Sequence, residues 1–233
     1  MSSNLRDIEF IHKLPKVKLV TNREDFILSF CKGKNVLDLG CVRSGMTKES
    51  FYKEDLLHLK LLKVARNVVG VDIDKEGIDF LTELGISNLI CLDVQELEKL
   101  NLDIRFDIII AGELIEHLDN PGLFLRGVSR FMRPDNTILI ITVPNAFSLR
   151  HFLAVILRSI ELVMQDHNFY FSYTNLYSLL ERHGFQILEL LPYYNIEATS
   201  NRFKHWCKAI LSQSIHRISP WSAEGLVVVA NRP

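Results

Sequence analysis

Short apolar runs alternate with longer amphipathic stretches along most of the chain, and this alternation predicts the fold. Five runs are followed by stretches that suit helices: residues 36–39, 68–71, 89–92, 106–111 and 137–143. Two further runs, residues 186–190 and 226–230, come later in the chain. Runs this uniformly apolar are typical of parallel strands that are covered on both faces. We therefore expect an α/β fold, with a doubly wound, mostly parallel seven-stranded sheet and helices on both faces.

The stretches between the runs carry ordinary helix signals. Asp74 can cap a helix that stops before Gly85, which suits the left-handed position after a helix end. Residues 176–184 have a leucine stripe at helical spacing and a closing glycine. Residues 201–213 are predicted to be helical as well. Residues 149–164 form a further predicted helix, apolar nearly all around, and a helix of that kind is expected to be buried on more than one side.

Acidic residues lie where the first three strands are predicted to end. In a doubly wound sheet the ligand sits beyond the carboxyl ends of the strands, next to the first strand. Asp72 could accept hydrogen bonds from both hydroxyls of a ribose, and Asp93 could accept one from the amine of an adenine. Asp38 would repel a pyrophosphate but would attract an ammonium or a sulfonium group. The set therefore suits S-adenosylmethionine better than NAD.

Composition narrows the class of protein. A chain of 233 residues, 48% of them hydrophobic, fits one globular domain, and we assign residues 1–233 to it, with residues 1–33 as an N-terminal helical lead-in. Lys and Arg number 27 and Asp and Glu 28, so no basic field favours nucleic acid as a partner. The four cysteines form no CxxC pair, which argues for a reduced, cytoplasmic setting. No apolar run approaches the ~20 residues of a transmembrane segment.

Six segments, in this order, resemble motifs of the class I S-adenosylmethionine-dependent methyltransferases: VLDLGC, VVGVDID, CLDVQEL, FDIIIAGELIEHL, RPDNTILIITVPN and HNFYFSYTNLYSLLERHGF. The resemblance covers roughly residues 24–231 and implies a Rossmann-like methyltransferase fold. It also implies S-adenosyl-L-methionine as the cofactor, with S-adenosylhomocysteine as its product. Eight residues match the positions that would bind this cofactor: Asp38, Gly40, Cys41, Asp72, Ile73, Asp93, Val94 and Gly112.

The glycine turn departs from the family pattern. The family usually has G-x-G-x-G after the first strand, whereas this chain has Val42 and Ser44 at the second and third glycine positions. A β-branched residue resists a positive φ, so we expect the turn to follow another path. The stretch from Gly40 to Asp72 is also longer than the ~20 residues of the related dinucleotide fold. We expect the extra residues, about 42–54, beside the methionine end of the cofactor.

An E-x-x-E-H segment follows the fourth strand. If this segment is helical, Glu113 and Glu116 share one face with His117 beside them. The favoured interpretation gives Glu116 and His117 a role in shaping the pocket or acting as the catalytic base, with no metal. In the alternative, Glu113, Glu116, His117 and His167 hold a divalent cation, because the segment also resembles the metal cluster of small-RNA 2′-O-methyltransferases.

The favoured function is methyl transfer to an oxygen or nitrogen of a small-molecule acceptor. One alternative is a metal-assisted RNA 2′-O-methyltransferase, and another is a non-catalytic interaction domain with a degenerate cofactor site. Residues 146–172 and 193–220 are expected to be insertions that cover the substrate. The apolar helix in the first of them could cover an apolar substrate, form a homodimer interface or lie against a lipid surface.

Overall fold

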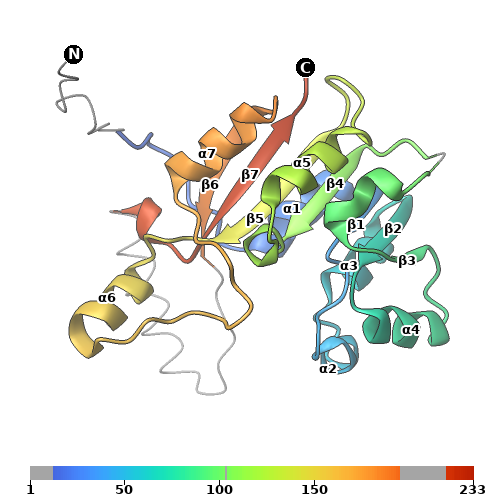
Figure 1. Cartoon of the computed structure of the whole chain (residues 1–233), viewed down its shortest axis with the longest axis horizontal. Helices are drawn as coiled ribbons and strands as arrows, with labels where there is room; N and C mark the ends of the chain where they lie inside the picture. Colours follow the sequence, from blue (N-terminus) through green and yellow to red (C-terminus); the bar gives the residue numbers. More distant parts are fainter. Residues whose placement is uncertain (1–12, 103, 195–218) are drawn as a thin grey trace, which may run out of the picture.

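The computed structural model describes residues 13–102, 104–194 and 219–233, and within them seven strands form one sheet (Figure 1). The strands are β1 (Asn35–Leu39), β2 (Asn67–Asp72), β3 (Leu89–Cys91), β4 (Ile108–Gly112), β5 (Ile138–Pro144), β6 (Gln186–Tyr193) and β7 (Gly225–Asn231). Their order is β3-β2-β1-β4-β5-β7-β6, and β7 alone of these runs antiparallel to its neighbours. This confirms the predicted doubly wound, mostly parallel sheet.

Helices cover both faces of the sheet. The α-helices are α1 (Arg23–Cys31), α2 (Thr47–Tyr52), α3 (Leu57–Val64), α4 (Lys75–Glu83), α5 (Pro121–Ser129), α6 (Leu149–Arg158) and α7 (Tyr173–Arg182). The described residues also form the 3-10 helices η2 (Val94–Lys99), η3 (Ile115–His117) and η4 (Pro220–Ser222). Asp74 caps α4 as predicted, since its side chain accepts a hydrogen bond from the backbone N–H of Gly77 at 3.2 Å. Of the predicted lead-in, only α1 is helical among the described residues 13–33.

Strand side chains point alternately into two core layers. Leu37, Ile109 and Ile141 belong to the layer that α5 and α7 cover. Ile110 and Ile140 point to the opposite layer, beneath α1 and α3. Successive side chains of a strand face opposite sides of the sheet, and here helices bury both sides. This double burial explains why the strands appear in the sequence as unbroken apolar runs.

Helix α6 departs from the prediction in length and in burial. It ends at Arg158, because Ser159 adopts a left-handed φ of 52° and the last N–H groups turn back to the carbonyls of Ala154 and Val155. Ala154 is its one buried residue. The prediction of a helix to residue 164, buried on more than one side, is therefore wrong. Figure 1 shows α6 beyond the carboxyl end of β5, apart from the other α-helices.

The remaining predictions concern membrane-spanning helices, the state of the cysteines and two segments in the later part of the chain. In the described part of the chain no helix is long and apolar enough to cross a membrane. Cys31, Cys41 and Cys91 are unpaired thiols. The predicted helix at residues 201–213 and most of the predicted insertion at residues 193–220 lie outside the described residues.

Candidate active site

The turn after β1 takes left-handed conformations at its two glycines only. Gly40 has a φ of 77° and Gly45 a φ of 69°, a region that favours glycine. Val42 has no such φ, and its N–H donates a hydrogen bond of 3.1 Å to Oδ2 of Asp72. The turn thus follows another path, as the sequence predicts, and that path ties the end of β1 to the end of β2.

Asp72 lies at the end of β2 with a largely buried carboxylate. Its Oδ1 accepts a hydrogen bond of 2.9 Å from the N–H of Asp74, and its Oδ2 accepts the one from Val42. Burial raises its pKa above the ordinary value. Each oxygen can accept a second hydrogen bond, and the neighbouring Ile73 side chain is 67% exposed. A carboxylate with spare lone pairs beside an exposed apolar surface fits the sugar and base of an adenosine.

Asp93 and Val94, the predicted adenine contacts, also stabilise the fold. Oδ1 of Asp93 caps η2 by accepting a hydrogen bond of 2.8 Å from the N–H of Gln95. The side chain of Val94 is buried in the core. Oδ2 of Asp93 accepts a second hydrogen bond, of 3.4 Å, from Nε2 of Gln95. The remaining lone pairs of this carboxylate and the backbone of Val94 are therefore the groups that could face a base.

Asp38 forms a buried pair that the sequence does not reveal. Its Oδ2 lies 2.9 Å from Nδ1 of His58, and neither residue is exposed by more than 2%. Gly70, opposite Asp38 in β2, leaves room for the imidazole, since a Cβ there would lie 2.8 Å from both Cε1 of His58 and Sγ of Cys41. Burial and the charge of Asp38 also raise the pKa of the Cys41 thiol, which therefore stays protonated. His58 lies in α3, and no local pattern marks it.

Glu113 does not share a helix face with Glu116, so that prediction is wrong. Glu113 has a left-handed φ of 52°, and the helical turn begins only at Ile115. Its Oε1 instead accepts a hydrogen bond of 2.8 Å from the hydroxyl of Tyr193 and lies 3.6 Å from Nη1 of Arg23. Neither partner was predicted from the sequence. The carboxylate of Glu113 thus joins α1 and β6 to the end of β4.

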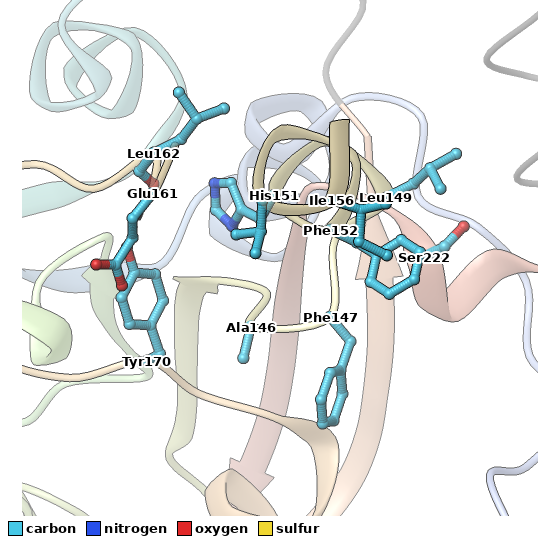
Figure 2. Close-up of a pocket in the computed structure, with 11 residues that line it drawn as sticks. Ala146, Phe147, Leu149, His151, Phe152, Ile156, Glu161, Leu162, Tyr170 and Ser222 are labelled. Atoms are coloured by element: carbon cyan, nitrogen blue, oxygen red, sulfur yellow. Dashed lines mark hydrogen bonds between the residues drawn. The ribbon is translucent and has the colours of Figure 1, made fainter. Parts of the chain in front are cut away.

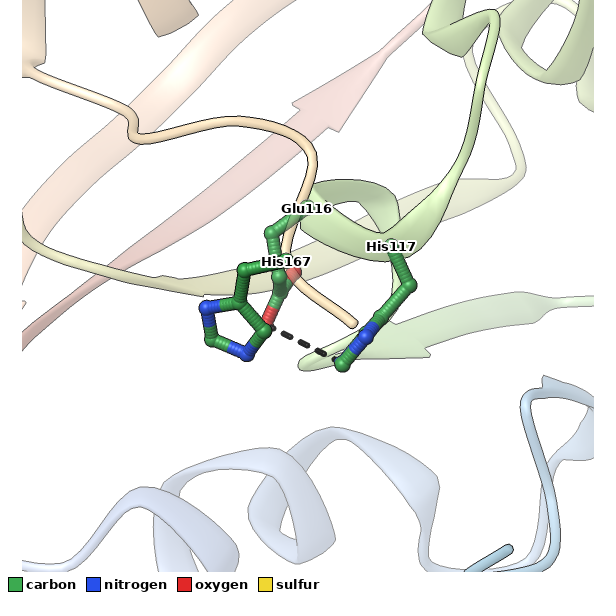
Figure 3. Close-up of side chains that lie close together, drawn as sticks. All are labelled: Glu116, His117 and His167. Carbon is green, nitrogen blue, oxygen red and sulfur yellow. Dashed lines mark ion pairs between the residues drawn. The ribbon is translucent and has the colours of Figure 1, made fainter. Parts of the chain in front are cut away.

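Three of the four residues of the metal alternative do come together (Figure 3). One potential ligand atom from each of Glu116, His117 and His167 lies within 4.8 Å of the others. The side chain of Glu116 is 1% exposed, and neither carboxylate oxygen has a hydrogen-bond partner among the described residues. Burial, followed by the charge of Glu113, raises the pKa of Glu116 to about 9, so this carboxyl group is protonated at neutral pH. Glu113 itself is not part of the cluster of ligand atoms.

His117 has the contacts of an oriented base. Its Nδ1 lies 3.1 Å from both the backbone oxygen and Oδ2 of Asp166, and because both of these are acceptors, Nδ1 carries the proton. Its Nε2 then has a lone pair and lies 4.0 Å from Oε1 of Glu116. The rings of His117 and His167 are 4.6 Å apart, edge to face. Burial and the proximity of His117 lower the pKa of His167, which favours a neutral ring.

Comparison with known proteins gives the family. Residues 10–190 match the methyltransferase domain family. A mitochondrial ubiquinone biosynthesis O-methyltransferase from Dictyostelium discoideum is 29% identical over 120 residues, which cover 50% of this chain and 37% of the relative. N-methyltransferase 4 from Papaver somniferum is 31% identical over 130 residues, 53% of this chain and 34% of the relative. The chain spans little more than a third of the length of these two curated relatives.

A solved structure agrees with the topology. A SAM dependent methyltransferase from Archaeoglobus fulgidus superposes with a TM-score of 0.57 over 90% of this chain and 91% of that chain. Its sequence is 20% identical, so the likeness concerns the fold. Since the family match spans more than half of the residues and the seven-stranded order agrees with it, the chain belongs to the methyltransferase domain family and has its Rossmann-like fold.

Proposed function

We propose that the protein transfers a methyl group from S-adenosylmethionine to an oxygen or nitrogen of a small-molecule acceptor. The observation that carries this proposal is the lone pair of Nε2 of His117, which lies beside the buried Glu116 just beyond the end of β4. In a doubly wound sheet this is next to the place where the ligand binds. The names of the two curated relatives, an O- and an N-methyltransferase, agree with such an acceptor.

The chain offers suitable groups for each part of the cofactor. Asp72 has spare acceptor capacity for the ribose hydroxyls, and Ile73 gives an apolar surface for the base. Gly40, Cys41 and Gly112 border the methionine end, above the buried Asp38. When it is bound, S-adenosylmethionine supplies an electrophilic methyl group on a sulfonium. The chain has to bind it, align an acceptor with it and remove a proton.

We assign the removal of the proton to His117. With S-adenosylmethionine bound, the acceptor oxygen or nitrogen would bond to the methyl carbon as the bond from that carbon to the sulfur breaks, and S-adenosylhomocysteine would be left. The proton of the acceptor would move to Nε2 of His117. The Nδ1–H remains directed at Asp166, whose carboxylate then stabilises the imidazolium. Glu116 is already protonated at neutral pH, so it cannot take the proton in place of His117. Alignment supplies most of the remaining acceleration, because the transfer is an in-line displacement.

A divalent cation is a second candidate for the same cluster, and one specific observation favours it. Both oxygens of Glu116 lack a partner among the described residues, and a cation held by Glu116, His117 and His167 would provide one. Such an ion would polarise the hydroxyl of the acceptor. The balanced charge of the chain and the names of the relatives favour a small acceptor over RNA in this case too.

Calorimetric titration with S-adenosylhomocysteine tests the cofactor site. The native protein should bind in the micromolar range, about −8 kcal/mol, and Asp72→Ala should lose most of that affinity. Asp79→Ala is the matched control, because Asp79 is an exposed carboxylate of α4 whose ion pair within the described part of the chain is with Lys75, at 2.7 Å. Absence of binding by the native protein would replace this proposal with the non-catalytic interaction domain.

Measuring turnover with and without a chelator distinguishes the metal-free mechanism from the one that needs a cation. If His117 acts as the base without a metal, EDTA leaves the rate unchanged and His117→Ala lowers it by roughly 10²–10⁴-fold. If a cation is needed, EDTA abolishes turnover, and Mg²⁺ or Mn²⁺ restores it.

A further inference from the structure

A cavity of about 620 Å³ lies beneath α6 (Figure 2). The figure shows side chains of α6, among them His151 and Phe152, above Ala146 and Phe147, with Tyr170 to one side. The lining is mainly apolar: Ala146, Phe147, Phe152, Val155, Ile156 and Leu162. Its volume lies within the ~300–1,000 Å³ of cavities that bind small molecules.

Helix α6 leaves its apolar side chains largely exposed above this cavity. Phe152, Val155 and Ile156 line the cavity and are each more than half exposed. A contiguous apolar surface of this kind usually marks a binding site. A cavity roofed by exposed apolar side chains therefore suits an apolar ligand better than a polar one.

The polar groups of the lining are compatible with an apolar ligand. The hydroxyl of Tyr170 donates a hydrogen bond of 3.2 Å to the carbonyl of Leu162. Burial, together with the charge of Arg150, lowers the pKa of His151 and favours its neutral form. Glu161 is exposed to solvent. Glu161 is therefore the one charged side chain among the described residues that line the cavity.

Residues 167–171 connect the candidate active site with the cavity, since His167 belongs to the cluster with Glu116 and Tyr170 lines the cavity. At one end of this segment the N–H of Asn168 donates a hydrogen bond of 2.7 Å to the carbonyl of Glu116. At the other end the N–H of Ala146 donates one of 2.9 Å to the carbonyl of Phe171. The segment therefore leads from the proposed base to the floor of the cavity.

A row of rings follows the same route. The ring of His117 lies 4.6 Å from that of His167, which lies 6.5 Å from Tyr170. Tyr170 in turn lies 6.1 Å from His151, and both of these last residues line the cavity. A molecule with its reactive end at His117 could thus lay the rest of its length along the rings and into the cavity.

We propose that this cavity binds an aliphatic tail of the methyl acceptor. The acceptor is then an amphiphile, with a hydroxyl or amine at one end and a hydrocarbon chain at the other. This inference rests on the proposed function, since it assigns the substrate class of the same site. The row of ring contacts from His117 to the lining residue Tyr170 is what favours a substrate tail over a second copy of the chain or a lipid surface.

A series of 4-alkylphenols with tails of two to ten carbons tests the proposal. Each is titrated into the protein saturated with S-adenosylhomocysteine. We expect the affinity to rise with each added methylene, by up to about fourfold, until the cavity is full. If affinity for the phenols does not depend on tail length while S-adenosylhomocysteine still binds, the tail site is wrong and the proposed function stands. If S-adenosylhomocysteine fails to bind, the proposed function itself fails.

Two neighbouring positions of α6 provide matched variants. Ile156→Glu places a carboxylate in the lining, whereas Leu157→Glu places the same group on a side chain that is 73% exposed and does not line the cavity. We expect Ile156→Glu to flatten the dependence on tail length and Leu157→Glu to retain it, with cofactor affinity unchanged in both. An equal loss in the two variants would overturn the proposal. Two other results would also overturn it. Light scattering could show that the native protein is a dimer, or vesicle binding could show that it attaches to phosphatidylcholine, with both variants abolishing that association equally.

Discussion

Replacing Gly70 by alanine should destabilise the protein by crowding the buried pair of Asp38 and His58. A Cβ at this position would lie 2.8 Å from three atoms: Sγ of Cys41, Cε1 of His58 and Cδ2 of Leu89. Ordinary carbon contacts begin near 3.5 Å, so each neighbour must move by more than half an ångström. Overpacking of this kind costs about 1–3 kcal/mol.

Movement of the imidazole adds to this cost. It lengthens the 2.9 Å contact between His58 and Asp38, and a weakened buried hydrogen bond to a charged group costs roughly another 1–2 kcal/mol. We therefore expect a total of about 3 kcal/mol. For a chain of this size each kcal/mol lowers the melting temperature by roughly 2–4 °C, which predicts a fall of about 6–12 °C.

Thermal unfolding followed by circular dichroism measures the effect, and Gly112→Ala is the control. Gly112 also lies in a strand, but a Cβ there would be 3.6 Å or more from its neighbours. That variant should melt within about 2 °C of the native protein. Adding Gly70→Ala to His58→Ala should cost less than adding it to the native chain, because the imidazole is gone. A Gly70→Ala protein as stable as the control would refute the argument.

Two further predictions concern buried polar groups. In the presence of EDTA, native stability should fall as pH rises, by up to about 1.4 kcal/mol per unit, because burial raises the pKa of Glu116 from 4.5 to about 9 in the folded state. Between these values the unfolded chain releases a proton that the folded chain retains. Urea unfolding of Glu116→Gln should show a flatter dependence, and parallel curves would contradict the assignment. Tyr193→Phe removes the hydroxyl that donates to Glu113 at 2.8 Å and should lower the free energy of unfolding by about 1–3 kcal/mol; an unchanged urea midpoint would contradict this.

The sequence predicts the sheet well because double burial makes each strand an unbroken apolar run. All seven strands lie within three residues of their predicted bounds. The helix ends of α4 and α7 also follow local rules, since Gly85 and Gly184 take the positive φ that a residue after a helix end often needs. The positions of Asp72 and Gly40 at strand ends follow from the same runs, while their role as cofactor contacts stays a proposal.

The missed features depend on contacts between residues far apart in the chain. His58 meets Asp38 across 20 positions, and Tyr193 meets Glu113 across 80. Gly225 lies opposite Tyr193 in the pairing of β6 with β7, and a Cβ at Gly225 would lie 2.1 Å from Cζ of Tyr193, so the need for glycine there follows only from that pairing. The exposure of α6 was missed for a similar reason. The sequence of an apolar helix indicates how much surface the helix could bury, but not whether another element of the fold packs against it.

The position of β7 has a consequence for the order of events during synthesis. Of the seven strands β7 is made last, yet it lies between β5 and β6 and pairs with both. Apart from one bridge between Val20 and Tyr193, the ladder of β6 in the described chain is formed with β7. A ribosome-bound chain that lacks β7 therefore exposes the edges of both strands, which is the kind of surface that aggregates or recruits chaperones. Tyr193 also ends β6, so the hydrogen bond that holds Glu113 beyond the end of β4 should form only after residues 225–231 have been translated.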